Sequence, residues 1–334
     1  MNRKICVVGA GAVGLSTALK IQTECPNAKV TVLAKEFYDK TTSFAAAGIY
    51  LPGEDEFIND PAIFKKWLQD SWDHYSKLCN SKDAGKAGAQ KISGYFLFKE
   101  GYKYKRPIFA DIVYQFRELS NEELKTISYG YFITTVVLDP SIYLKYLEAS
   151  LRKNGTELIK AQVNSLEELS NDFDIIVNCS GLGSQKLAND SDLYPVKGQV
   201  LKVEAPWMKH FTYVYSYDAT CYVIPGVKAV TVGGTREKGN YDKRPDSKKT
   251  EEIWERALGY FPELYEAKRN YVIGGLRPTK LDMLVKPEIL NCGNGKSIPV
   301  IHNYGHGKHG IALSWGTATE SAKLAKSLIS NSNL

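Results

Sequence analysis

Three of the five histidines of this 334-residue chain lie close together, in the segment HNYGHGKHG that starts at position 302. The spacing of His302, His306 and His309 would place three imidazoles on one face of a helix, which is one way to build a zinc site. Three glycines interrupt the same span, however, and each glycine costs a helix interior about 1 kcal/mol relative to alanine. We therefore expect no metal site here and interpret the segment as a backbone loop.

A glycine-rich motif near the N-terminus points to a different chemistry. An apolar strand pattern is followed at once by GAGAVG at 9–14 and then by a helical pattern. In such a unit Gly9 permits the tight turn, Gly11 lets the backbone approach a pyrophosphate, and Gly14 lets the helix pack closely on the sheet. The N–H groups at the start of the helix would face the anion.

The residues after this motif strengthen the prediction of a dinucleotide site. Another apolar strand pattern at 30–33 is followed by Glu36, whose carboxylate can accept hydrogen bonds from ribose hydroxyls. The segment TTSFAAAG at 41–48 then supplies three hydroxyls and a run of very small residues, which suits close approach to a large flat ring such as a flavin. The alternative is that TTS caps a helix and AAAG is a tight packing contact.

The composition is that of an ordinary globular protein. Hydrophobic residues make up 43% and charged residues 24% of a chain long enough for two packed domains. The net charge of +6 is small, which argues against nucleic-acid or membrane binding and is compatible with an anionic small molecule. The six cysteines are isolated and no apolar run reaches the ~18 residues of a spanning helix, so we expect a soluble intracellular protein.

The remaining patterns predict an α/β protein with two intertwined parts. Residues 61–78 carry aromatic side chains at helical spacing, and 173–183 repeat a buried strand running into a small-residue turn. Several strand-like segments between 195 and 235 predict a mixed, largely antiparallel sheet. We predict a discontinuous Rossmann-like FAD-binding domain at 1–52, 135–200 and 286–334, and a substrate domain at 53–134 and 201–285.

Nine motifs, taken in order, resemble the D-amino-acid oxidase family, and within it the D-aspartate oxidase branch. They are VVGAGAVGLSTA, TTSFAAAG, SGYFLF, IVNCSGLGS, GQVLKVEAPW, YVIPG, VTVGGTREKG, GLRP and HNYGHGKHGIALSWGTA. Members of this family bind FAD and oxidise a D-amino acid to an imino acid, which hydrolyses to the 2-oxo acid and ammonia. Their reduced flavin returns electrons to O2 as hydrogen peroxide. The resemblance implies an enzyme with FAD as its cofactor.

The same resemblance assigns the substrate contacts. Arg277 would hold the α-carboxylate in a bidentate ion pair, and the hydroxyl of Tyr222 would meet the same carboxylate. The carbonyl of Lys308 would accept a hydrogen bond from the substrate amine, although relatives usually carry a small residue there. The α-hydrogen would leave as hydride to flavin N5 without a side-chain acid or base, so we expect loss of Arg277 to harm activity more than loss of any histidine.

A set of FAD-binding residues follows from the glycine motif and the resemblance together. In this interpretation the HGKHGIA segment wraps the flavin with backbone groups rather than with histidine side chains. The predicted set is Gly9, Ala10, Gly11, Val13, Gly14, Lys35, Glu36, Thr42, Ser43, Gly48, Val163, Ser180, Gly307, Gly310, Ile311 and Ala312. Relatives carry the acid before the base where this chain has Lys35-Glu36, so either neighbour can make the ribose contact.

Arg236 bears on the choice of substrate. It matches a position where D-aspartate oxidases carry arginine and relatives with neutral substrates carry an uncharged residue. A second cation would pair with a side-chain carboxylate, which favours D-aspartate and then D-glutamate. The alternatives are an oxidase of neutral D-amino acids and a flavoprotein that has lost catalysis. The segment HFTYVYSYDATC lacks the basic residue of mammalian-type enzymes, so Tyr215 or Tyr217 would cover the pocket instead.

The last three residues suggest a cellular address. Ser332, Asn333 and Leu334 resemble a variant of the SKL peroxisomal signal, which an import receptor reads. An enzyme that makes peroxide gives such an address a chemical reason. We expect a peroxisomal protein, with the cytoplasm as the alternative.

Overall fold

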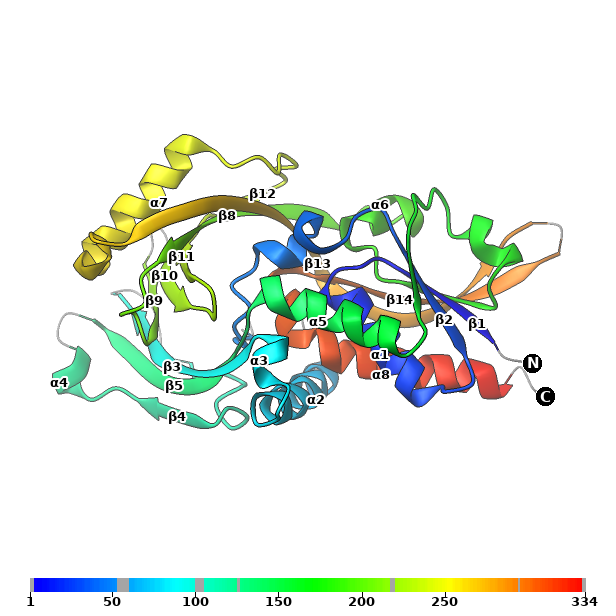
Figure 1. Cartoon of the computed structure of the whole chain (residues 1–334), viewed down its shortest axis with the longest axis horizontal. Helices are drawn as coiled ribbons and strands as arrows, with labels where there is room; N and C mark the ends of the chain where they lie inside the picture. The colour runs from blue at the N-terminus through cyan, green and yellow to red at the C-terminus, as the bar shows by residue number, and fades with distance from the viewer. Residues whose placement is uncertain are drawn as a thin grey trace.

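One mixed β-sheet runs through the whole computed structural model and helices pack against it (Figure 1). The structure describes residues 3–52, 60–99, 105–124, 127–216, 220–293 and 295–331. Within these residues the sheet has 14 strands in the order β4-β5-β3-β9-β10-β11-β8-β13-β14-β7-β1-β2-β6, with β12 paired to β8. The predicted α/β class is confirmed.

The bounds of the elements are as follows. The strands are β1 (Lys4–Val8), β2 (Lys29–Ala34), β3 (Ala89–Phe98), β4 (Gln115–Glu118), β5 (Tyr129–Leu138), β6 (Glu157–Lys160), β7 (Ile175–Asn178), β8 (Tyr194–Glu204), β9 (Phe211–Tyr215), β10 (Cys221–Pro225), β11 (Val230–Gly233), β12 (Glu237–Lys238), β13 (Lys268–Asn291) and β14 (Ser297–His306). The helices are α1 (Ala12–Glu24), α2 (Pro61–Cys79), α3 (Ala84–Ala87), α4 (Asn121–Leu124), α5 (Pro140–Lys153), α6 (Ser184–Leu187), α7 (Ser247–Tyr260) and α8 (Gly310–Asn331). Short 3-10 turns are η1 (Tyr38–Lys40), η2 (Thr42–Ala45), η3 (Glu167–Asn171), η4 (Gly181–Gly183), η5 (Pro262–Leu264) and η6 (Gly307–His309).

The nucleotide half of the sheet is parallel and assembled from distant parts of the chain. Strand β1 pairs in parallel with β2 and with β7, and β14 adds in parallel to β7. Helix α1 packs between α5 and α8 beside these strands. Strands β1, β2 and β7 are buried, which explains why their sequences are nearly continuous apolar runs. First, middle and last segments of the chain therefore lie side by side in this half of the sheet.

The other half of the sheet is largely antiparallel, as predicted. Strands β9, β10, β11 and β8 pair antiparallel in succession, and β5 pairs antiparallel with β3. Among the described strands of this half, only β3 and β9 pair in parallel. Helix α7 covers part of this half, and its buried face packs on β8, β10 and β11.

Strand β13 joins the two halves. Its first part pairs with β8 from Lys268 to Thr279, and its second part pairs with β14 from Leu284 to Asn291. Three of the predicted domain boundaries, at 134, 200 and 285, fall inside β5, β8 and β13. The division into domains stays a prediction, with the two parts sharing strands.

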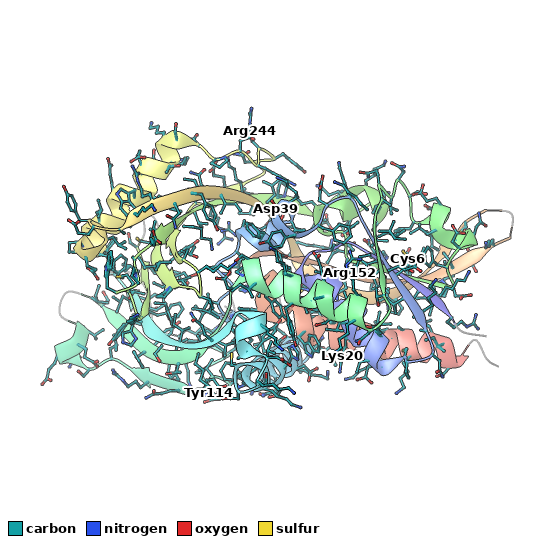
Figure 2. All side chains as sticks on the ribbon, viewed as in Figure 1. Cys6, Lys20, Asp39, Tyr114, Arg152 and Arg244 are labelled. Atoms are coloured by element: carbon teal, nitrogen blue, oxygen red, sulfur yellow. The ribbon has the colours of Figure 1, made fainter. Side chains whose placement is uncertain are left out.

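Helix α2 supports the start of α8. Asp60 caps its N-terminus by accepting hydrogen bonds from the backbone N–H groups of Ala62 and Ile63, both at 3.0 Å. Its buried face carries aromatic rings, as the spacing predicts, and the hydroxyl of Tyr75 donates to the carbonyl of Ile311 at 2.7 Å. Side chains fill the space between sheet and helices, with Cys6 inside and Arg244 at the outer surface (Figure 2). Among the helices described, none is long and apolar enough to cross a membrane.

Candidate active site

A cavity of about 1380 Å³ extends from the carboxyl ends of β1, β2 and β7 to the face of the antiparallel half. Its volume exceeds the roughly 300–1,000 Å³ of ordinary small-molecule sites, which leaves room for a dinucleotide and a small substrate together. With one exception, every residue predicted to bind cofactor or substrate lines this cavity. The exception is Gly14, which is buried behind it.

The glycine turn presents bare backbone to the cavity. Gly9 has a φ of +116°, and a Cβ at this position would overlap the carbonyl of Cys179. A Cβ at Gly11 would lie 3.1 Å from the hydroxyl of Ser43. A Cβ at Gly14 would overlap the carbonyl of Gly9, so Gly14 serves the packing of α1 on β1 rather than a direct contact.

The TTSFAAAG segment both caps α1 and lines the cavity. The backbone N–H of Ala12 donates to the hydroxyl of Ser43 at 2.9 Å, and the hydroxyl of Thr42 donates to the carbonyl of Leu276 at 3.0 Å. Gly48 has a φ of +79°, and a Cβ there would overlap the carbonyl of Leu138. Ser43 thus makes the capping contact and Gly48 the packing contact of the alternative interpretation, and both residues also line the cavity.

The far end of the cavity lies beside β2. Lys35 and Glu36 follow this strand, and both line the cavity, so the structure leaves the ribose contact open to either. Lys160 donates to the carboxylate of Glu36 at 3.3 Å, but both side chains are exposed and such a pair contributes little stability. Val163 and Ser180 complete this end, one buried and one half-buried.

The histidine segment is not the loop that its glycines suggest. Residues up to His306 belong to strand β14, and the chain then makes the 3-10 turn η6 before entering α8. The glycines act at the end of the strand, where Gly305 and Gly307 have φ values of +88° and +53°. Strand pairing therefore overrides the local signal. Gly307, Gly310, Ile311 and Ala312 line the cavity, their contact with a flavin stays a prediction, and the Lys308 side chain is exposed.

Two histidines of this segment, His302 and His306, have structural partners. The His302 ring nitrogens lie 2.8 Å from a carboxylate oxygen of Glu288 and 3.3 Å from the amide of Asn178. His306 Nε2 lies 3.1 Å from the hydroxyl of Thr317, and burial lowers the pKa of His306 to about 3. In the part of the chain that the structure describes, no three His, Cys, Asp or Glu side chains gather as metal ligands would.

Arg277 reaches the cavity from β13 across β8. Its Nη1 donates to the carbonyl of Thr235 at 3.3 Å, and its guanidinium lies directly over the backbone of Gly198. A Cβ at Gly198 would overlap three atoms of that guanidinium. Sequence reasoning missed Gly198, although a glycine inside a strand often marks a close approach of this kind.

Tyr222 lies beside Arg277 on strand β10. Gly233 and Gly234 leave space for its ring, since a Cβ on Gly234 would stand 2.6 Å from the Tyr222 hydroxyl. Burial raises the pKa of Tyr222, and the nearby charge of Arg277 only partly offsets that rise. The hydroxyl is therefore protonated at neutral pH and can donate a hydrogen bond to a carboxylate.

A wall of stacked aromatic rings faces this corner and was not predicted. Tyr213 stacks on Tyr222 at 4.8 Å and on Phe96 at 5.1 Å between ring centroids. Tyr215, one of the two predicted covering residues, lines the cavity and stacks on Phe98 at 4.8 Å. The signal in the sequence is the alternation of aromatic residues on β3 and β9, which places them on one face of the sheet. Tyr217 lies outside the described residues.

Arg236 lines the same cavity at its edge. It follows the Gly233-Gly234-Thr235 stretch that contacts Tyr222 and Arg277, and its side chain is exposed. The structure thus places Tyr222, Arg277 and Arg236 along one cavity, with Tyr222 and Arg277 both beside the stretch 233–235 that leads into Arg236. These side chains offer cations and a phenol donor to an anionic small molecule, while the glycine turn offers bare backbone to a nucleotide.

The comparisons with known proteins agree with this division. Residues 4–324 match the family model described as "FAD dependent oxidoreductase". The chain is 38% identical to the D-aspartate oxidase of Homo sapiens, over 98% of this chain and 95% of that protein. It is 33% identical to D-aspartate oxidase 1 of Caenorhabditis elegans over the full length of both. The crystal structure of glycine oxidase from Geobacillus kaustophilus superposes with a TM-score of 0.79 at 18% identity, covering 98% of this chain and 95% of that one.

Proposed function

The chain belongs to the FAD-dependent oxidoreductases of the D-amino-acid oxidase family, and we propose that it oxidises acidic D-amino acids, D-aspartate first and D-glutamate next. FAD is its cofactor, and the end of the cavity lined by Gly9, Ala10 and Gly11 fits that group, because it presents side-chain-poor backbone at the N-terminus of α1 to an anionic pyrophosphate. The products would be the 2-oxo acid, ammonia and hydrogen peroxide. The similarity to D-aspartate oxidases over nearly the full length supports the acidic substrate.

One observation carries the proposal, namely the corner formed by Arg277 and Tyr222. Arg277 is half-buried and, among the residues that the structure describes, has no Asp or Glu partner. A guanidinium without a counter-ion at the wall of a cavity is suited to a substrate carboxylate, which it can bind bidentately. The Tyr222 hydroxyl adds a neutral donor to the same position.

The protein residues act here by positioning. Arg277 and Tyr222 fix the α-carboxylate, so the α-carbon of the substrate is held in one place and orientation. The cavity supplies no histidine base, because His306 is buried, has a pKa of about 3 and contacts Thr317. When bound, FAD would supply the oxidation, with two electrons leaving the substrate and O2 as their final acceptor.

Arg236 is proposed as a determinant of the acidic substrate. Its exposed side chain at the edge of the cavity can meet a side-chain carboxylate as the substrate enters. The test compares wild type with Arg236→Gln on D-aspartate, D-glutamate and D-alanine, with peroxide and ammonia release as the assay. A selective loss on the two acidic substrates supports the proposal, and wild-type preference for D-alanine would overturn it.

The alternative function is oxidation of neutral D-amino acids. The observation in its favour is the aromatic wall, since Phe96, Tyr213 and Tyr215 offer an apolar surface to an uncharged side chain. The same substrate panel separates the two functions, because this alternative predicts the highest kcat/KM with D-alanine or a larger apolar D-amino acid.

The peroxisomal address stays a prediction, because residues 332–334 lie outside those that the structure describes. A fluorescent fusion carrying the full chain, with and without its last three residues, measures it directly. Loss of a punctate peroxisomal signal on truncation is the expected result, and an unchanged distribution would contradict it.

A further inference from the structure

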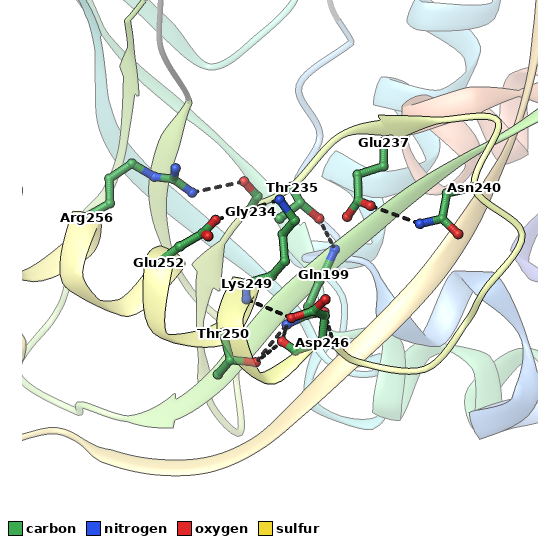
Figure 3. Close-up of polar contacts among 10 residues, drawn as sticks. All are labelled: Gln199, Gly234, Thr235, Glu237, Asn240, Asp246, Lys249, Thr250, Glu252 and Arg256. Atoms are coloured by element: carbon green, nitrogen blue, oxygen red, sulfur yellow. Dashed lines mark hydrogen bonds and ion pairs between the residues drawn. The ribbon is translucent and has the colours of Figure 1, made fainter.

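A third arginine, Arg256, reaches the cavity from helix α7. It lines the cavity together with Lys249, Glu252 and Ile253 of the same helix. Figure 3 shows Arg256 extending from α7 toward Gly234, with Glu252 one turn before it. No sequence motif identifies this residue, because an arginine in an amphipathic helix is expected to be solvent-exposed.

The position of Arg256 is tied to that of Arg277. Nη2 of Arg256 donates to the carbonyl of Gly234 at 3.3 Å, and Nη1 of Arg277 donates to the carbonyl of Thr235 at 3.3 Å. The two guanidinium groups therefore bind carbonyl oxygens of consecutive residues. Tyr222 lies at the same place, since a Cβ on Gly234 would meet its hydroxyl at 2.6 Å. The charge of Arg256 also acts on Tyr222, whose pKa it lowers in opposition to burial.

The charge of Arg256 is not compensated by the protein. Within the described part of the chain, no Asp or Glu carboxylate lies at ion-pair distance from it, and its buried Nε has no hydrogen-bond partner. Glu252, one helical turn before Arg256, lies 3.7 Å from Lys249 instead. A half-buried guanidinium with unused donors is costly in the free protein and becomes favourable when an anion arrives.

We propose that Arg256 is a specificity-determining residue that binds the side-chain carboxylate of the substrate. This inference rests on the proposed function, because it takes D-aspartate as the substrate whose α-carboxylate is held by Arg277. A dicarboxylate then lies between two cations that flank Tyr222. Arg236 acts at the exposed edge, whereas Arg256 acts at the wall beside the reacting end.

The test compares kcat/KM for D-aspartate and D-alanine in wild type, Arg256→Gln and Arg256→Lys. Arg269→Gln is the matched control, because Arg269 pairs with Glu251 of the same helix at 2.8 Å and does not line the cavity. Binding of malonate and of acetate to the oxidised holoenzyme, followed by the change in flavin absorbance, gives a readout independent of turnover. Flavin content and thermal unfolding show whether each variant is folded.

Loss of a charged hydrogen bond predicts a fall of about 10- to 100-fold in kcat/KM for D-aspartate in Arg256→Gln, with D-alanine changed little. Malonate should bind more weakly in this variant while acetate does not, and Arg256→Lys should recover part of both losses. Equal losses on D-aspartate and D-alanine would show a structural role through Gly234 and overturn the inference alone. Wild-type preference for D-alanine would overturn the proposed function, and the inference with it.

Discussion

Replacing Gly198 by alanine tests the position of Arg277 without touching that arginine. A Cβ at Gly198 would lie less than 3.0 Å from Nη1, Nη2 and Cζ of Arg277, and these are the nearest atoms it would meet. Ordinary contact between heavy atoms is about 3.5–4.0 Å, so the guanidinium must move by about 1 Å or more. The backbone itself tolerates alanine, because Gly198 has no positive φ.

The expected result is a loss of function without a loss of stability. The guanidinium is the free end of a flexible side chain, so its displacement costs the fold little, whereas a misplacement of about 1 Å at a reacting centre can cost about 100-fold in rate. We expect kcat/KM for D-aspartate to fall by about 10- to 100-fold with normal flavin content. Oxygen consumption measures the rate, and thermal unfolding measures the stability.

Gly259→Ala is the matched control for this variant. Among the residues that the structure describes, no atom lies within 4 Å of a Cβ at Gly259, which is near the end of α7 and does not line the cavity. It should keep wild-type activity and gain up to about 1 kcal/mol of stability from the better helix former. Activity of Gly198→Ala within about twofold of wild type would refute the placement of Arg277 over Gly198.

Three further predictions follow from the glycine turn, the buried tyrosine and the buried histidine. Gly14→Ala should yield protein without flavin, because the added methyl would overlap the Gly9 carbonyl. The ratio of flavin to protein absorbance after incubation with FAD measures the occupancy. Full occupancy of this variant would contradict the prediction. Tyr222→Phe should lower kcat/KM for D-aspartate about 10-fold. The pH dependence of kcat/KM below pH 10 should keep its shape, because burial raises the pKa of Tyr222 above that value. A loss of activity at alkaline pH that occurs in wild type and is absent from Tyr222→Phe would contradict this assignment. Burial lowers the pKa of His306 from an ordinary 6.5 to about 3 in the folded protein. Between these two pH values the unfolded state binds a proton that the folded state does not. The free energy of unfolding therefore falls by up to about 1.4 kcal/mol for each pH unit below 6.5. His306→Asn should flatten this dependence in urea unfolding between those two pH values, and an identical slope would show that His306 is not its source.

The nucleotide half could be predicted from the sequence because its signals are local. Apolar runs, the glycine spacing and Glu36 are read within one βαβ unit, and the structure places β1, α1 and β2 where these patterns indicate. The TTSFAAAG segment carried two interpretations, and the contacts of Ser43 and Gly48 show that capping and cavity lining occur together.

The substrate half could not be predicted in the same way because its contacts are long-range. The strand β13 has 24 residues and pairs with two different partners, which no local pattern reveals. The HNYGHG segment reads as a loop from its glycines, yet it is held in the sheet by pairing with β13. The role of Gly198 depends on its contact with Arg277, and the role of Arg256 depends on its hydrogen bond to Gly234. Both partners are distant in sequence.

The most direct test of the central claim is an anaerobic titration of the purified flavoprotein with D-aspartate and, separately, with D-alanine. The absorbance of the oxidised flavin, near roughly 450 nm, reports reduction without any contribution from the reaction with oxygen. Bleaching by D-aspartate at far lower concentration than by D-alanine is the predicted result. Bleaching first by D-alanine would overturn the acidic substrate, and a flavin band that neither amino acid bleaches would contradict the oxidase function.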